Sequence, residues 1–336
     1  SCSMGGMKAI GSCSALAVDD PDSLQDIVVD VPQLRPRDVL VRVLAVSVNP
    51  VDVKRRRGLA PSETPTILGH DAAGIVEAIG PEVTTLSVGD EVWYAGDVTR
   101  PGTNAEFHAV DERIVSRKPS MLSFSDAAAL PLTTITAWET LFERFRLNLD
   151  STGTLLVLGA AGGVGSIMIQ LAKLLTGVRV VATASRPESH DWVLRLGADA
   201  VVNHHDLQDQ VSRIAPEGVD YLFTPHSAGG IETFAAIMRP FGHITAIDEP
   251  EGLDLLPLKA KSIAWHWELM FTRSLFDYDM IGQQRLLART ADLVDRGLIT
   301  TTVTKTISGL DAEGIREAHR DIETGQTIGK VVVCRQ

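Results

Sequence analysis

Short apolar segments separated by turn residues run along the first third of the chain. Segment 38–48 alternates apolar and polar positions well enough to predict a strand with one buried face. Gly, Pro and Asp residues separate the shorter β-like segments that follow, at 72–79, 91–94 and 105–110. No regular helical period appears there. We therefore predict a compact, mainly β domain.

From Ser125 onward the pattern changes to apolar strands that alternate with helices. Ser125 has the residue type of a helix N-cap, and a domain boundary is expected close to it. Predicted strands lie at 154–158, 178–182, 200–202, 221–224 and 243–247, with helices at about 164–175 and 188–196. Such alternation predicts a parallel sheet covered on both faces. The sequence thus indicates an α/β protein, and its 336 residues are enough for two domains.

The net charge limits which partners are expected, and the cysteine content indicates the cellular setting. The formal net charge is -12 at pH 7, so the surface repels phosphate backbones and anionic lipid, and neither nucleic acid nor a membrane is expected as a partner. Cys2, Cys13 and Cys334 have no paired spacing for a metal or a disulfide framework, which favours a reducing, cytoplasmic setting. Residues 1–6 have the small-residue character of an expression tag and are left out of the fold prediction.

A glycine-rich loop between an apolar strand and a helix is the strongest chemical signal. It contains Gly159, Gly162, Gly163 and Gly165. Glycines allow the backbone to approach a pyrophosphate, and the helix N-terminus offers free N–H groups. The spacing departs from G-x-G-x-x-G because Ala160 stands two positions before Gly162. We predict a dinucleotide site here; the alternative is a purely structural strand-to-helix turn.

The end of the next strand indicates which dinucleotide binds. NAD-binding proteins usually carry an acidic residue about 20 positions on, where it hydrogen-bonds the ribose 2′-hydroxyl. Here the strand ends in Ser185 and Arg186, a hydroxyl and a guanidinium that suit a 2′-phosphate. NADPH is therefore the predicted cofactor. The alternative for Arg186 is a solvated loop charge, and Lys173 is interpreted as a helix-surface charge.

Several separated motifs follow one another in a set order. They lie at 46–52, 68–74, 88–92, 127–138 and 159–165. In these motifs, and over nearly its whole length, the chain resembles the medium-chain dehydrogenase/reductases. Segments 93–97, 184–188 and 265–273 resemble more narrowly the zinc-type alcohol dehydrogenase-like proteins and quinone oxidoreductases.

This resemblance implies the domain organisation. A GroES-like catalytic domain would comprise residues 1–130 and 271–336, and a Rossmann domain, a doubly wound parallel sheet that binds NADPH, would comprise residues 131–270. The nicotinamide would lie in the cleft between them, in agreement with ligand binding beyond the carboxyl ends of parallel strands. The resemblance also implies a homodimer that pairs Rossmann-sheet edges at about residues 243–260.

Cofactor contacts follow from the same motifs. By resemblance, the nicotinamide end would contact Thr136, with Asn49, Ile247, Phe271 and Lys330 as further neighbours. The pyrophosphate and 2′-phosphate would contact Gly159, Gly162, Gly163, Val164, Ser185 and Arg186.

A catalytic zinc ion in this superfamily would need three protein ligands and one open position. His70 and Asp71 occupy the histidine and acid positions, but Asn49 and, approximately, Leu132 stand where cysteines would be. Segment 97–107 also lacks the cysteines of a structural zinc lobe. We therefore predict no bound zinc; a zinc-dependent alcohol dehydrogenase with atypical ligands is an alternative.

Without a Lewis acid, the charge that develops during hydride transfer must be stabilised by hydrogen bonds or by delocalisation within the substrate. This favours NADPH-dependent reduction of a quinone, enone or related carbonyl. Candidate catalytic donors are Asn49, Asp52, Tyr94 and His70, each of which also has a structural interpretation. The basic run 54–57 is interpreted as a solvated loop, and the alternative is that it guards the pocket entrance. A protein that binds NADPH without turnover is the second hypothesis, and the sequence leaves the physiological substrate and the reaction direction open.

Overall fold

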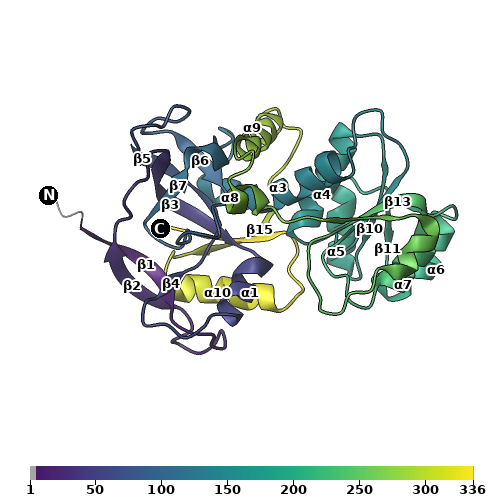
Figure 1. Ribbon diagram of the computed structural model, residues 1–336, viewed down its shortest axis with the longest axis horizontal. Coiled ribbons are helices and arrows are strands. Elements are labelled where there is room, and N and C mark those ends of the chain that lie inside the picture. The colour runs from purple at the N-terminus through teal and green to yellow at the C-terminus, as the bar shows by residue number, and fades with distance from the viewer. Residues whose placement is uncertain (1–4, 336) are drawn as a thin grey trace. The chain divides into compact units, whose positions relative to one another are not determined.

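The computed structural model describes residues 5–335 (Figure 1). The chain divides into two compact units. Residues up to 135 together with those from 271 onward form the discontinuous unit, and residues 136–270 form the central unit. Of the proposed tag, residues 1–4 lie outside the described residues, as does Cys2. Gly6, which we had excluded with them, is the first residue of a strand.

Two mainly antiparallel sheets build the discontinuous unit. The smaller has the order β2-β1-β4, from β1 (Gly6–Ser12), β2 (Gln25–Asp30) and β4 (Thr66–Ile67). The larger has the order β15-β16-β3-β5-β6-β8, with β7 paired to β3. Its strands are β3 (Asp38–Val48), β5 (Asp71–Ile79), β6 (Glu91–Tyr94), β7 (Phe107–Asp111), β8 (Val115–Arg117), β15 (Val303–Ser308) and β16 (Lys330–Cys334). The predicted mainly β domain is therefore present.

Most helices of this unit were not predicted from the sequence pattern. The helices are α1 (Pro50–Arg57), α2 (Phe124–Ala128), α8 (Thr272–Phe276), α9 (Ile281–Asp295) and α10 (Ala312–Glu323), while α3 (Pro131–Trp138) crosses the boundary between the units. The expectation of a solvated loop at 54–57 was wrong, because this run lies on α1 beside α10 (Figure 1). Arg56 is buried there, where its guanidinium pairs with Glu323 and donates to His319 Nδ1 at 2.7 Å.

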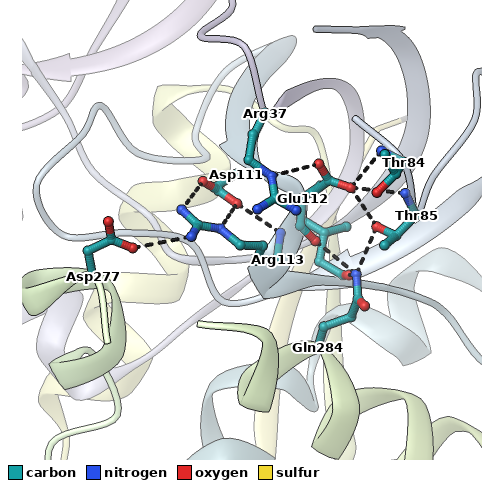
Figure 2. Close-up of polar contacts among 9 residues, drawn as sticks. Arg37, Thr84, Thr85, Asp111, Glu112, Arg113, Asp277 and Gln284 are labelled. Atoms are coloured by element: carbon teal, nitrogen blue, oxygen red, sulfur yellow. Dashed lines mark hydrogen bonds and ion pairs between the residues drawn. The ribbon is translucent and has the colours of Figure 1, made fainter. Parts of the chain in front are cut away.

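A polar network joins the returning C-terminal segment to the first part of the chain (Figure 2). The buried carboxylate of Glu112 accepts hydrogen bonds from the backbone and side chain of Thr85, the backbone of Thr84 and the side chain of Arg37. From α9, Gln284 donates to the carbonyl oxygens of Glu112 and Val115 at 3.0 and 2.9 Å. These contacts explain how two segments far apart in sequence form one unit.

A six-stranded parallel sheet forms the centre of the other unit, in the order β11-β10-β9-β12-β13-β14. Its strands are β9 (Thr154–Val157), β10 (Arg179–Thr183), β11 (Ala200–Val202), β12 (Val219–Thr224), β13 (Met238–Ala246) and β14 (Ala264–Trp267). The helices are α4 (Gly163–Leu175), α5 (Pro187–Arg195), α6 (Leu207–Ile214) and α7 (Ile231–Ile237). This confirms the predicted doubly wound fold, in which the strand order reverses beside β9 and ligands bind at the carboxyl ends of the strands.

Irregular helical turns complete the chain. A π-helical turn (Glu139–Arg144) continues α3, and short 3-10 helices lie at Glu112–Ile114, His204–Asp206 and Leu256–Lys261. Within residues 5–335, no helix combines the length and the apolar character that crossing a bilayer requires.

Candidate active site

The glycine-rich loop follows β9 and leads directly into α4. Gly159 has a φ of 59°, in the left-handed region that favours glycine, and its N–H donates to Thr183 Oγ1 at 3.0 Å. The N–H of Gly162 donates to the Gly159 carbonyl at 3.0 Å, which closes a tight turn. A Cβ on Gly165 would lie 2.3 Å from the Ala160 carbonyl oxygen, so the helix passes the loop too closely for any side chain.

The N-terminus of α4 is available to an anion. Gly162, Gly163 and Val164 are partly exposed, and α4 runs for 13 residues behind them. Its first N–H groups and the positive end of its dipole suit a pyrophosphate. The loop therefore fits the dinucleotide expected from the sequence.

The end of β10 carries the residues expected to distinguish NADPH from NADH. Ser185 is exposed and Arg186 is half-buried immediately before α5. Residues 184–186 include no carboxylate that could accept from a ribose hydroxyl. Lys173 lies on α4 and pairs with Asp199 at 2.9 Å, as a helix-surface charge would.

Two further candidate cofactor neighbours lie in the central unit. Thr136 is on α3, and Ile247 follows the last residue of β13. The N–H of Ile247 donates to the Thr224 carbonyl at 3.3 Å, which places Ile247 at the carboxyl end of the sheet. This is the edge at which parallel sheets bind their ligands.

Five buried polar residues gather in the discontinuous unit, and we call them the Asp71 cluster: Ser47, Asn49, Asp52, Asp71 and Lys330. Each is at most 2% exposed. Strand register brings most of them together, because Ser47 pairs with Asp71 across β3 and β5, and Val331 pairs with Val48 across β16 and β3. Asn49 is the N-cap of α1 and Asp52 lies in the first turn of that helix.

Both carboxylate oxygens of Asp71 accept hydrogen bonds. Oδ2 accepts from Ser47 Oγ at 2.6 Å and from Asn49 Nδ2 at 2.8 Å, and Oδ1 accepts from the Leu132 N–H at 2.7 Å. The ammonium group of Lys330 lies 3.7 Å from Oδ2 and donates to Asn49 Oδ1. Asn49 is therefore held at both ends of its amide, and its orientation is fixed.

Burial disfavours the charged forms of Asp71 and Lys330, whereas the proximity of the two groups favours them. Burial raises the pKa of Asp71, whereas Lys330 and the donated hydrogen bonds lower it. Burial likewise lowers the pKa of Lys330, and the nearby carboxylates oppose this. Because every partner of Asp71 is a donor, the arrangement is that of an ionised carboxylate beside an ammonium group.

Asp52 has one satisfied oxygen and one without a partner among the described residues. Its Oδ2 accepts from the Asn49 N–H at 2.8 Å, whereas the buried Oδ1 has no hydrogen bond. Burial raises the pKa of Asp52 from 3.8 to about 7. The carboxyl group therefore exchanges a proton near neutral pH, as a general acid must.

His70 lies next to the Asp71 cluster but remains neutral. Its Nε2 accepts from Arg55 Nη1 at 3.2 Å, and its ring packs on Phe271 with centroids 4.8 Å apart. Burial, together with the positive charge of Arg55, lowers the pKa of His70 to about 3. An imidazole in this state does not serve as a cationic acid at physiological pH.

Tyr94 belongs to a separate hydrogen-bonded pair. His108 Nε2 donates to the Pro101 carbonyl at 2.9 Å, so its Nδ1 accepts from the Tyr94 hydroxyl at 2.9 Å. Burial raises the pKa of Tyr94 above its ordinary value. Of the four candidate donors, the structure thus brings Asn49 and Asp52 together, places His70 beside them, and assigns Tyr94 a structural partner.

Comparison with known proteins identifies the family. Residues 35–120 match the alcohol dehydrogenase GroES-like domain, and residues 196–333 match the zinc-binding dehydrogenase family. A zinc-type alcohol dehydrogenase-like protein of Staphylococcus epidermidis is 38% identical over 97% of this chain and 99% of its own length. The chain belongs to the medium-chain dehydrogenase/reductase family. It is therefore an oxidoreductase of the medium-chain type.

Two further proteins are similar to this chain. A crystal structure from Rhizobium etli, described as a candidate zinc-dependent alcohol dehydrogenase, superposes with a TM-score of 0.94, at 45% identity and 98% coverage of both chains. An Arabidopsis thaliana protein named NADPH-dependent alkenal/one oxidoreductase is 35% identical over 65% of this chain and 56% of its own length.

Some medium-chain enzymes bind zinc, but the Asp71 cluster does not fit that metal. Asp71 has both oxygens engaged, and the ammonium group of Lys330 stands where it would repel a cation. In the part of the chain that the structure describes, no three His, Cys, Asp or Glu residues gather in a way that could hold a metal ion. Asn49 supplies an amide where a zinc site needs a thiolate or an imidazole.

Sequence reasoning missed two residues near this site. Ser47 lies within a predicted strand and could have been found only from the β3–β5 register. Arg55 is one of four consecutive basic residues, and the sequence alone did not distinguish it from the others. A helical interpretation of this run would have placed Arg55 and the buried Arg56 on different sides of the helix.

Proposed function

We propose that this protein transfers hydride from NADPH to a conjugated carbonyl compound, an enone or a quinone, without a metal ion. The Asp71 cluster carries this proposal. An ammonium group already compensates Asp71, so the negative charge that develops on the substrate must be stabilised by hydrogen bonds and by conjugation within the substrate. Simple alcohols and aldehydes lack that conjugation.

The choice of NADPH rests on the end of β10. The exposed hydroxyl of Ser185 and the guanidinium of Arg186 are groups that bind a 2′-phosphate through charge-assisted hydrogen bonds. The Arabidopsis relative, named for NADPH-dependent action on alkenals and alkenones, supports the same cofactor and substrate class.

The chain's own residues would stabilise the enolate and deliver a proton. NADPH, when bound, supplies the hydride. Asn49 donates one Nδ2 hydrogen to Asp71, and we assign its second to the developing enolate oxygen. Lys330 polarises the same amide through Oδ1 and strengthens that donor. Asp52, which accepts a hydrogen bond from the backbone N–H of Asn49, would donate a proton to the enolate.

The decisive experiment follows NADPH and NADH oxidation by protein of measured metal content. The acceptors are enones, quinones and saturated aldehydes. We expect NADPH oxidation with the conjugated acceptors in metal-free protein. Cofactor binding without turnover would instead support a sensor or structural role, and alcohol oxidation that requires zinc would refute the proposal.

Cofactor choice has its own test. In Arg186→Gln we expect the KM for NADPH to rise about tenfold, the worth of a charge-assisted hydrogen bond, while the KM for NADH stays unchanged. Lys173→Gln is the matched control, because Lys173 already pairs with Asp199. Equal effects on both cofactors would contradict the role of Arg186.

A further inference from the structure

Arg55 carries a charge that forms no salt bridge with a carboxylate among the described residues. Its neighbours on α1 differ in this respect, since Arg56 and Arg57 both pair with Glu323. Arg55 is half-buried, and its hydrogen bond goes to His70, through Nη1. A guanidinium has five N–H donors in a fixed fork, so most of this fork remains available.

The groups around Arg55 compensate its charge only in part. His70 is an uncharged acceptor, as its lowered pKa requires. Asp52, one turn earlier on α1, directs Oδ2 to the Asn49 N–H and is only partly ionised near neutral pH. Asp71 and Lys330, the other two ionisable groups of the Asp71 cluster, form an ion pair with each other. A half-buried cation is screened less than a surface one, so it attracts an anion.

We propose that Arg55 binds an anionic group of the substrate, so that the preferred substrates are conjugated carbonyl compounds bearing a carboxylate. This inference rests on the proposed function. The position supports it, because Arg55 touches His70, which packs on Phe271 and directly precedes Asp71. A planar guanidinium matches a carboxylate in a bidentate pair.

The reaction with such a substrate balances without a further reactant. One alkene carbon receives hydride from NADPH and the other receives a proton from Asp52, so the carbon–carbon π bond is lost and NADPH becomes NADP⁺. The carboxylate takes no part in bond making. Arg55 is accordingly a specificity-determining residue that holds the substrate in place.

A matched pair of probes tests this inference. Benzoylacrylate and its methyl ester are enones that differ in one negative charge, and benzoylpropionate and its methyl ester are their saturated, non-reducible counterparts. We expect Arg55→Gln to lower the acid-to-ester ratio of kcat/KM about tenfold, with KM carrying the change. Comparing ratios between wild type and variant removes the different intrinsic reactivity of acid and ester.

Controls separate Arg55 from general charge and from the cofactor. Arg57→Gln removes the same charge from α1 and should keep the wild-type ratio. Arg55→Lys should restore part of the preference, because it keeps the charge and loses the fork. The KM for NADPH should stay constant in Arg55→Gln; a rise would mean that the anion bound by Arg55 belongs to the cofactor and would overturn the inference.

Calorimetric binding of benzoylpropionate and its ester gives a readout that does not depend on turnover. An acid preference that Arg55→Gln abolishes supports the inference even if neither enone is reduced, in which case the proposed function alone fails. Reduction of both enones with no acid preference, or with a preference that survives in Arg55→Gln, overturns the inference and leaves the proposed function standing.

Discussion

The substitution Asp52→Asn should change how stability depends on pH. The asparagine Oδ1 can still accept from the Asn49 N–H, so the first turn of α1 keeps its hydrogen bond. What is lost is a buried group that titrates near neutral pH. In wild type, burial raises the pKa of Asp52 from 3.8 to about 7, and this difference is worth ~4 kcal/mol at ~1.4 kcal/mol per pKa unit.

The sign follows from linkage between protonation and folding. A folded-state pKa above the unfolded value stabilises the fold below the unfolded pKa, and this contribution is lost as pH rises through the folded pKa. The free energy of unfolding of wild type, relative to Asp52→Asn, should therefore fall by ~4 kcal/mol between about pH 4 and about pH 8. Buried His70 has the opposite trend, but it is present in both proteins and cancels in the difference.

Denaturant unfolding of both proteins across this pH range measures the difference. The same buffers serve for kcat, which should decline in wild type above about pH 7 as the proton donor ionises. In Asp52→Asn, kcat should be lower and should lack this decline. A free-energy difference that stays constant with pH would show that Asp52 titrates normally, and the assignment of Asp52 as the acid would then fail.

Three further substitutions and one control test other parts of the structure. Arg56→Met should lower the free energy of unfolding in denaturant by ~3 kcal/mol, because it leaves the buried His319 without its hydrogen-bond donor and Glu323 without its buried partner. The exposed Arg57→Gln should cost less than ~1 kcal/mol, and equal losses would contradict the burial argument. Glu112→Gln should cost ~2 kcal/mol in urea. Burial raises the pKa of Glu112, but its hydrogen bonds outweigh burial and hold the pKa below its ordinary value of 4.5 (Figure 2). The stability difference between wild type and Glu112→Gln should therefore vanish as pH falls below 4.5 and Glu112 becomes protonated. Gly165→Ala should weaken NADPH binding in calorimetry at least about tenfold, since the added methyl forces the loop aside; unchanged affinity would exclude this loop as the cofactor site.

The sequence predicted the elements whose signals are local. β3 was predicted with its observed bounds, Asp38–Val48, because its alternating positions lie within one short segment. The parallel strands and the start of α4 were recognisable for the same reason. Helix α1 was not, since four consecutive basic residues contain no apolar period, and the burial of Arg56 depends on Glu323, far along the chain.

The Asp71 cluster could not be predicted because it depends on strand register. Asn49 and Asp52 were candidates from their motif, but nothing local indicates that Lys330, 281 positions after Asn49, donates to its amide. That contact exists because β16 pairs antiparallel with β3, with Val331 opposite Val48. Sequence reasoning could therefore name the residue types of the site but not which of them neutralise one another.

This pairing also limits the chemistry that the site can support. A metal ion with an open coordination position binds a substrate oxygen directly, whereas the ammonium group of Lys330 has three hydrogens and faces Asn49 Oδ1, the Val48 carbonyl and Asp71. With those positions taken, Lys330 would influence a substrate bound as proposed only through Asn49. One amide donor stabilises a localised alkoxide poorly but is sufficient for a charge already spread over an enolate, so these contacts support the proposed reduction of a conjugated acceptor without zinc.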